Sequence, residues 1–217
     1  MNRDEIWQVI DAQRRAVADL LDGLDDQQWR EPSLCAGWTV RDVAAHLTLQ
    51  QLRLRDMPMM LTQMRATMDK TIAHMARKRA AALTADRIVA EIRATVGSRR
   101  HQLGVTYLEN LADILVHGQD IAIPLGIRHD MPPQAAVVAA NRLLSMRWPP
   151  PLPGVRAVAG FRLTATDIDW THGDGPEACG PMGALLLVCA GRVAALPQLS
   201  GPGAAALTAR FGVAARA

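Results

Sequence analysis

The sequence predicts a mainly α-helical protein with a small α+β region at its C-terminal end. Through the first two thirds of the chain, apolar residues recur at the three- and four-residue spacing of amphipathic helices. A proline-rich stretch, RWPPPLPG, then interrupts every pattern, and a stiff linker is expected there. Alternating apolar and polar residues, rich in β-branched types, follow it. We therefore expect a helical region over residues 1–147 and a small α+β region over residues 155–217.

The first two helices are predicted from their apolar spacing and their ends. Residues 6–21 fit one helix, which the sequence GLDD ends. The second helix is expected over residues 40–55. Thr39 and Asp42 resemble a capping box at its start, in which a hydroxyl and an acidic side chain accept hydrogen bonds from free backbone N–H groups.

Four more helices complete the helical region. The third is expected over residues 58–81, and Thr84 caps the fourth, which ends before Gly104. The fifth covers residues 106–121, and the sixth covers 131–146 with prolines in its first turn, where a missing N–H costs little. The third helix carries an apolar stripe that we assign to the core: Met60, Leu61, Met64, Met68, Ile72 and Met75.

The C-terminal region has too few elements to form a large core. FRLTATDIDWTHGDG predicts two short strands that meet at a turn, and GPMGALLLVCAGR and GPGAAALTARF predict short helices. Because about 60 residues can barely support a core of their own, we expect this region to be an appendage that packs against the helical part.

Composition is that of an ordinary soluble protein, with 49% hydrophobic and 21% charged residues and a net charge of +3. Its three cysteines are scattered, which favours a reducing cytoplasm over a disulfide-stapled secreted domain. We expect no signal peptide and no membrane-spanning run. The absence of a basic block with interleaved aromatic residues argues against nucleic acid as a partner.

Asp113 and His117 are the most informative pair of polar residues. They are four positions apart, so on a helix they lie on one face, where both can reach one divalent ion. A surface hydrogen bond is the alternative for this pair, and a core or capping role is the alternative for His46. A third ligand from another helix would change both interpretations, because three protein ligands and an open position describe a catalytic metal site. Spacing alone does not show that His46 meets the pair.

Three motifs resemble the mycothiol-dependent maleylpyruvate isomerase family within the DinB-like superfamily. They are CAGWTVRDVAAHL, DILVHGQDIAIPLG, and a C-terminal set, DIDWTHGDG, CGPMGALLLVCAGR and LSGPG, similar to a region that many actinobacterial members carry. The resemblance implies a four-helix bundle that binds a divalent metal, commonly zinc, through His46, Asp113 and His117. Family members usually have Glu at the position of Asp113, and the Asp side chain is one methylene shorter than that of Glu. The nearest spare carboxylate, Glu109, lies one turn away.

Three other residues have two possible roles each. Arg192 is a candidate catalytic residue that offers a cation to an acidic substrate, or it caps the preceding helix. His172 faces a substrate cleft or is solvated. Cys35 is reactive because it lies near a helix start, or it is a small buried residue.

The resemblance implies a metal-dependent thiol transferase or isomerase that uses mycothiol as cosubstrate. Its partners would be this low-molecular-weight thiol and a small electrophile, in the cytoplasm, and bundles of this type often form homodimers. The alternative is a non-enzymatic bundle that binds a metal or a small molecule. The presence of Asp113, where family members usually have Glu, favours this alternative. A DNA-binding regulator is a remote third reading, because no basic recognition helix is present.

Overall fold

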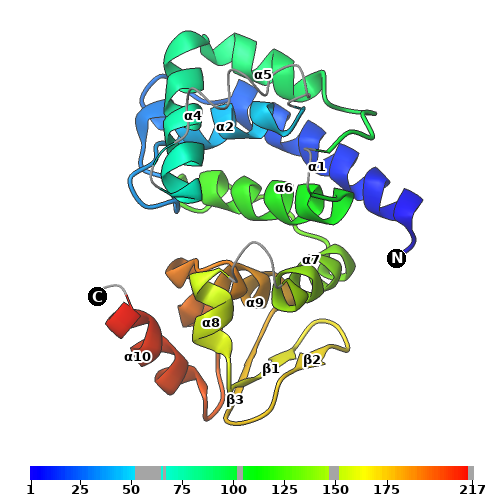
Figure 1. Ribbon diagram of the computed structural model, residues 1–217, viewed down its shortest axis with the longest axis vertical. Coiled ribbons are helices and arrows are strands. Elements are labelled where there is room, and N and C mark those ends of the chain that lie inside the picture. Colours follow the sequence, from blue (N-terminus) through cyan, green and yellow to red (C-terminus); the bar gives the residue numbers. More distant parts are fainter. Residues whose placement is uncertain (52–64, 66, 102–104, 147–151, 215–217) are drawn as a thin grey trace. The chain divides into compact units, whose positions relative to one another are not determined.

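The computed structural model describes residues 1–51, 65, 67–101, 105–146 and 152–214. Contacts divide the chain into two compact units, Asn2–His129 and Asp130–Ala217 (Figure 1). Within the described ranges, no helix is both long enough and apolar enough to cross a membrane. The mainly helical fold with a small C-terminal sheet is the one predicted from the sequence.

The N-terminal unit is a helical bundle. Its helix α1 packs against α5 and α6, and α2 packs against α4, α5 and α6 (Figure 1). Two short 3-10 helices precede and follow α2 along the chain, η1 (Gln28–Arg30) and η2 (Leu49–Gln51). The α-helices described in this unit are α1 (Arg3–Asp22), α2 (Val40–Thr48), α4 (Met68–Ala82), α5 (Ala85–Arg93) and α6 (Tyr107–Ala122).

Side-chain caps explain where α2, α5 and α6 begin. The Thr39 side chain accepts from the Asp42 N–H while the Asp42 carboxylate accepts from the Thr39 N–H, so the predicted capping box is confirmed. Thr84 caps α5 as predicted. At α6, Thr106 and Glu109 form a second capping box. Glu109 is therefore engaged at the helix start.

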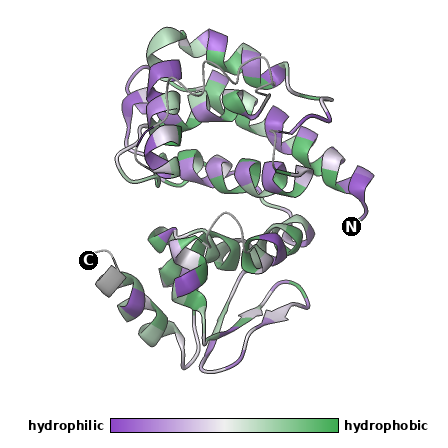
Figure 2. Cartoon of the chain, viewed as in Figure 1, coloured by the Kyte–Doolittle hydropathy of each residue, from purple (hydrophilic) through white to green (hydrophobic). Residues whose placement is uncertain are grey.

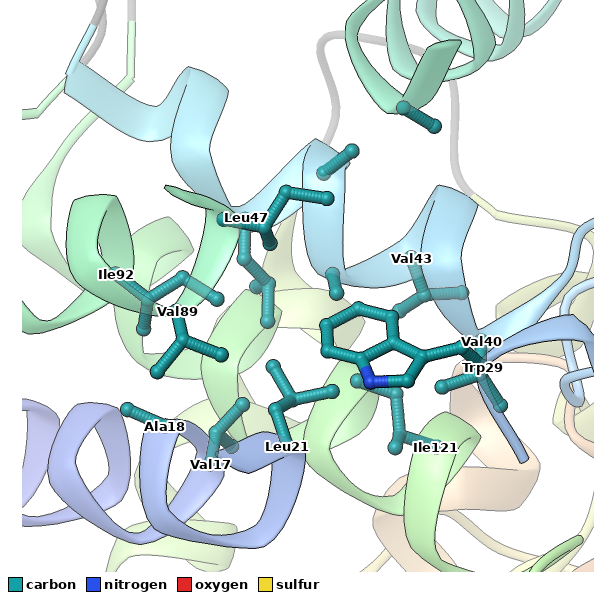
Figure 3. Packing of buried hydrophobic residues seen from close by; sticks show 14 of the residues in the cluster. Val17, Ala18, Leu21, Trp29, Val40, Val43, Leu47, Val89, Ile92 and Ile121 are labelled. Atoms are coloured by element: carbon teal, nitrogen blue, oxygen red, sulfur yellow. The ribbon is translucent and has the colours of Figure 1, made fainter. Parts of the chain in front are cut away.

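The core of the bundle lies between α1, α2, α5 and α6. Figure 3 shows the Trp29 indole among apolar side chains of this cluster, including Val40 and Val43 of α2 and Ile121 of α6. These side chains are nearly or fully buried, and burying each one stabilises the fold by about 1.5–3 kcal/mol relative to exposure. The same packing sets α2 against α6.

The predicted methionine stripe is wrong in part. Met75 is buried, but Met68, in the first turn of α4 next to the N-cap Thr67, is 69% exposed. Met60, Leu61 and Met64 lie outside the described residues. The predicted second helix ends earlier than expected, since α2 stops at Thr48 and passes into η2.

The C-terminal unit combines helices with a small sheet. Strand β1 pairs antiparallel with β2, as the predicted hairpin requires, and parallel with β3, which was not predicted. Helix α8 begins within the proline-rich stretch and was also missed. The described elements are α7 (Pro133–Ser145), α8 (Pro153–Val158), β1 (Arg162–Ala165), β2 (Thr171–His172), β3 (Glu177–Gly180), α9 (Met182–Cys189), η4 (Val193–Gln198) and α10 (Ala204–Ala214).

Helix α9 is the centre of this unit. It is apolar along its whole length (Figure 2), and seven of its eight residues are buried. Both α7 and α8 pack against it. This packing places α7 with the C-terminal elements, whereas the ranges predicted from the sequence, 1–147 and 155–217, placed it with the bundle. As statements about independently folding domains, those ranges stay a prediction.

Candidate metal centre

The three predicted metal ligands lie together between α2 and α6. His46 comes from the last turn of α2, and Asp113 and His117 are one turn apart on α6. The Nε2 atom of His46 is 3.5 Å from Asp113 Oδ2, and the Nε2 atom of His117 is 3.2 Å from Asp113 Oδ1. The two imidazole rings meet edge to face with centroids 4.9 Å apart. One donor atom from each residue lies within 4.8 Å of the others.

These distances fit a shared divalent cation. Zinc binds imidazole nitrogen and carboxylate oxygen at about 2.0–2.2 Å, so two donors of one tetrahedral site stand roughly 3.4 Å apart. The separations of 3.5 Å between Asp113 Oδ2 and His46 and of 3.2 Å between Asp113 Oδ1 and His117 lie on either side of that spacing, each through a different oxygen of the carboxylate. Asp113 thus reaches both rings although it is shorter than Glu. Two imidazoles and one carboxylate are also a donor set typical of open zinc sites.

The cluster is poorly exposed and strongly coupled. The side chains of His46 and His117 are 12% and 13% exposed, and that of Asp113 is 31% exposed. Burial would raise the pKa of Asp113, yet His117 and His46 beside it hold this pKa well below its usual value. Burial would likewise lower the pKa of His117, yet the Asp113 carboxylate raises it well above the usual value. Both shifts favour the charged forms of the pair, a carboxylate and an imidazolium, when no cation is bound.

Gln50 and Trp38 also line the cluster, and sequence reasoning missed both. Gln50 is 3% exposed, and its Nε2 atom donates to Asp113 Oδ2 at 2.6 Å. Trp38 presents its ring to His46, with centroids 5.6 Å apart at a steep angle. Among the described residues, the buried Nδ1 atom of His46 has no hydrogen-bond partner. His46 is accordingly held by packing and by the contact of its Nε2 atom with Asp113, whereas Asp113 also accepts a hydrogen bond from Gln50.

Asp120 holds the opposite side of the His117 ring. It is fully buried, and its Oδ2 atom lies 2.8 Å from His117 Nδ1. When the His117 ring is neutral, a hydrogen bond here makes Nδ1 the protonated nitrogen, and the Nε2 lone pair then faces Asp113. Metal-ligating histidines generally show this arrangement, in which a carboxylate fixes the tautomer and the ring orientation.

Cys35 completes a second group of potential metal donors with His117 and Asp120. Its Sγ atom donates to Asp120 Oδ2 at 3.1 Å and is 3.8 Å from His117 Nδ1. The distance of 2.8 Å between His117 and Asp120 is a hydrogen-bond length, shorter than the roughly 3.4 Å between two donors of one tetrahedral zinc ion. The geometry therefore favours the group of His46, Asp113 and His117 as the cation site, with Asp120 and Cys35 behind it.

The remaining candidates have other surroundings. The Arg192 guanidinium donates to the Ala190 carbonyl at 2.6 Å, directly after α9, which is the capping role. A catalytic role for Arg192 stays a prediction. His172 is exposed on β2 and stacks on Trp170 with ring centroids 6.1 Å apart.

Comparisons with known proteins agree with this fold. Residues 10–122 match the family described as the mycothiol maleylpyruvate isomerase N-terminal domain. The chain is similar to the crystal structure of the mycothiol-dependent maleylpyruvate isomerase, with a TM-score of 0.59, 15% identity, and coverage of 88% of this chain and 90% of that one. A mutant of that isomerase matches over the same shares with a TM-score of 0.58 and 15% identity. No curated protein matches the chain.

Proposed function

Because the chain belongs to the mycothiol maleylpyruvate isomerase N-terminal domain family, we propose that it is a metal-dependent enzyme that uses a low-molecular-weight thiol. The cosubstrate would be mycothiol, and the reaction would be isomerisation or S-transfer on a small electrophile. The observation that supports this proposal most is the convergence of His46, Asp113 and His117 from two helices. Members of the family include a mycothiol-dependent maleylpyruvate isomerase.

The proposed ligands are the Nε2 atoms of His46 and His117 and the carboxylate of Asp113. Their nitrogen and oxygen donors suit zinc among the divalent cations. When bound, such a cation favours the thiolate form of a coordinated thiol over the neutral form. Two neutral imidazoles and one carboxylate neutralise only one of its two charges, so the open position would suit an anionic sulfur.

The residues around the site would orient the three proposed ligands. Asp120 fixes the His117 ring, Gln50 fixes the Asp113 carboxylate, and the Trp38 ring packs on His46. A thiolate held in this way can add to an activated double bond, allow rotation and leave again, or it can displace a halide or open an epoxide. Holding the sulfur and the electrophile in line is the main contribution that the protein itself would make.

The test is a thiol-conjugation and isomerisation assay with zinc, mycothiol and three model electrophiles: an α,β-unsaturated acid, an alkyl halide and an epoxide. We expect the wild-type protein to turn over substrate with zinc. Turnover should be lost when a chelator is added, and it should also be lost in His46→Ala and in His117→Ala. Each ligand substitution should weaken zinc binding by more than the roughly 10- to 100-fold loss typical of residues behind a ligand. His74→Ala is the matched control, because His74 lies on α4 and contacts Arg65.

Three results would contradict the proposal. Turnover that persists in His46→Ala and His117→Ala would place the chemistry elsewhere. Zinc binding that depends on both histidines, without turnover of any electrophile, would support the alternative of a non-enzymatic metal-binding bundle. If metal analysis of the purified protein finds no cation, and a chelator leaves stability unchanged, a metal-free binding protein is the better description.

A further inference from the structure

The Oδ2 atom of Asp120 lies within hydrogen-bond distance of two side-chain donors. His117 Nδ1 lies 2.8 Å from it and the Cys35 thiol donates to it at 3.1 Å. Asp120 is fully buried and Cys35 is partly buried. A buried carboxylate needs such partners, because a charge that loses them carries a large desolvation cost. The orientation of this carboxylate therefore depends on the thiol as well as on the imidazole.

The loop before α2 is built to hold Cys35 at that point. Within it, the Ser33 N–H donates to the Trp38 carbonyl and the Trp38 N–H donates to the Cys35 carbonyl, both at 2.9 Å. Gly37 has a φ of +74°, a conformation that favours glycine, so the turn can close tightly. The Leu34 N–H donates to the backbone carbonyl of Asp120 at 3.1 Å. The loop is thus tied to the backbone and to the side chain of one residue of α6.

We propose that Cys35 is a positioning residue that acts through Asp120: its thiol fixes the carboxylate that orients His117 toward the cation. The inference rests on the proposed metal site and adds a residue to it. Cys35 would not touch the cation or the substrate, and no change in its oxidation state is involved. Its effect would be seen in the affinity and the coordination geometry of the cation.

The test measures zinc affinity of the full-length protein by competition with a fluorescent chelator, and coordination geometry by the visible spectrum of the cobalt form. Asp120→Asn should weaken zinc binding about 10- to 100-fold, the range for partners directly behind a ligand. Cys35→Ala should weaken it less, on the order of threefold to tenfold, since a thiol is a weak donor. Cys35→Ser should recover part of the loss, and Cys179→Ala, a cysteine of the C-terminal unit, should change nothing.

A double-mutant cycle tests the route through Asp120. If Cys35 acts only through that carboxylate, Cys35→Ala should cause no further loss of zinc affinity in the Asp120→Asn background. Additive losses would overturn the inference, and so would a Cys35→Ala protein with unchanged affinity and an unchanged cobalt spectrum. Should Asp120→Asn fail to fold, the loss in Cys35→Ala and its rescue in Cys35→Ser decide the matter.

A metal-independent measurement separates this inference from the proposed function. The infrared S–H stretching band of Cys35, assigned by its loss in Cys35→Ala, should lie at the frequency of a hydrogen-bonded thiol and should move in Asp120→Asn. A band that does not move overturns the inference even if zinc binds. If wild-type protein binds no zinc while the band does move, the thiol–carboxylate contact stands and the proposed metal function fails.

Discussion

Gln50 holds one carboxylate oxygen of Asp113 in place. Its amide donates to the same Oδ2 atom that faces His46, and it is almost completely buried. The carboxylate of Asp113 has one rotatable bond fewer than Glu, so a single strong hydrogen bond can define its direction. The reach that a longer side chain would supply is replaced by a fixed orientation.

We therefore expect Gln50→Ala to weaken zinc binding about 10- to 100-fold. The loss arises because Asp113 would rotate among several orientations and few of them point an oxygen at the cation. Zinc affinity by chelator competition is the measurement, and Gln27→Ala, at an exposed glutamine before η1, is the control. Equal affinities in Gln50→Ala and the control would show that the hydrogen bond from Gln50 does not control the orientation of Asp113.

The ionic pair of Asp113 and His117 makes the stability of the metal-free protein depend on pH, and a bound cation should change that dependence. Without metal, the raised pKa of His117 stabilises the fold fully below the unfolded value of about 6.5, and this contribution is lost as pH rises through the folded value. The lowered pKa of Asp113 adds stability that is present above about pH 3.9 and is lost as pH falls through its folded value. A bound cation requires a neutral His117, so zinc binding should release a proton.

Urea unfolding from pH 6 to pH 9, with zinc and with a chelator, checks this. We expect the chelated protein to lose stability as pH rises above about 6.5, and the stabilisation by zinc to grow over the same range. His117→Ala should remove both trends. A zinc effect that is constant with pH would contradict the assignment of His117 as a ligand.

At the scale of elements, the starts of α2 and α5 could be predicted because each depends on a local capping pattern, whereas the capping box of Thr106 and Glu109 at α6 was not predicted. Thr39 with Asp42, and Thr84, are caps that the sequence displays directly. The spacing of Asp113 and His117 likewise follows from the helix period. The resemblance to a family that the motifs indicated is confirmed over residues 10–122. These features share one property, which is that a few neighbouring residues determine them.

The elements and contacts that could not be predicted depend on distant residues. Strand β3 has its place because it lies parallel to β1, and no turn signal marks such a pairing. Gln50 and Cys35 meet their partners 63 and 85 positions further along the chain. Met68 fits a helical stripe, but the stripe does not show that the first turn of α4 is exposed. Periodicity gives the direction of a side chain on its helix and leaves its neighbours undetermined.

At the scale of the whole molecule, the open question is which ranges fold alone. Helix α7 packs against α9, and its alanines at 135, 136, 139 and 140 are fully buried. A chain of residues 1–147 would keep α7 without α9. A chain of residues 1–129 would keep the whole bundle unit and the proposed site.

We expect residues 1–129 to fold cooperatively and to bind zinc with the affinity of the full chain. In residues 1–147, α7 should exchange its amide hydrogens rapidly while the rest of the bundle stays protected. Circular dichroism melting and hydrogen exchange read by mass spectrometry are the measurements. If 1–129 is unfolded and 1–147 is folded, the boundary predicted from the sequence is the physical one.

The origin of the proposed ligands in two helices, α2 and α6, has a consequence for the order of folding. A cation held by His46, Asp113 and His117 would close a loop of chain that contains α4 and α5. In the unfolded chain these donors are rarely close, because closing so long a loop is entropically unfavourable. The cation would therefore bind only after α6 has docked on α2. It would stabilise the folded state without stabilising the transition state for folding. Its main kinetic effect would therefore be to slow unfolding while leaving the rate of folding nearly unchanged.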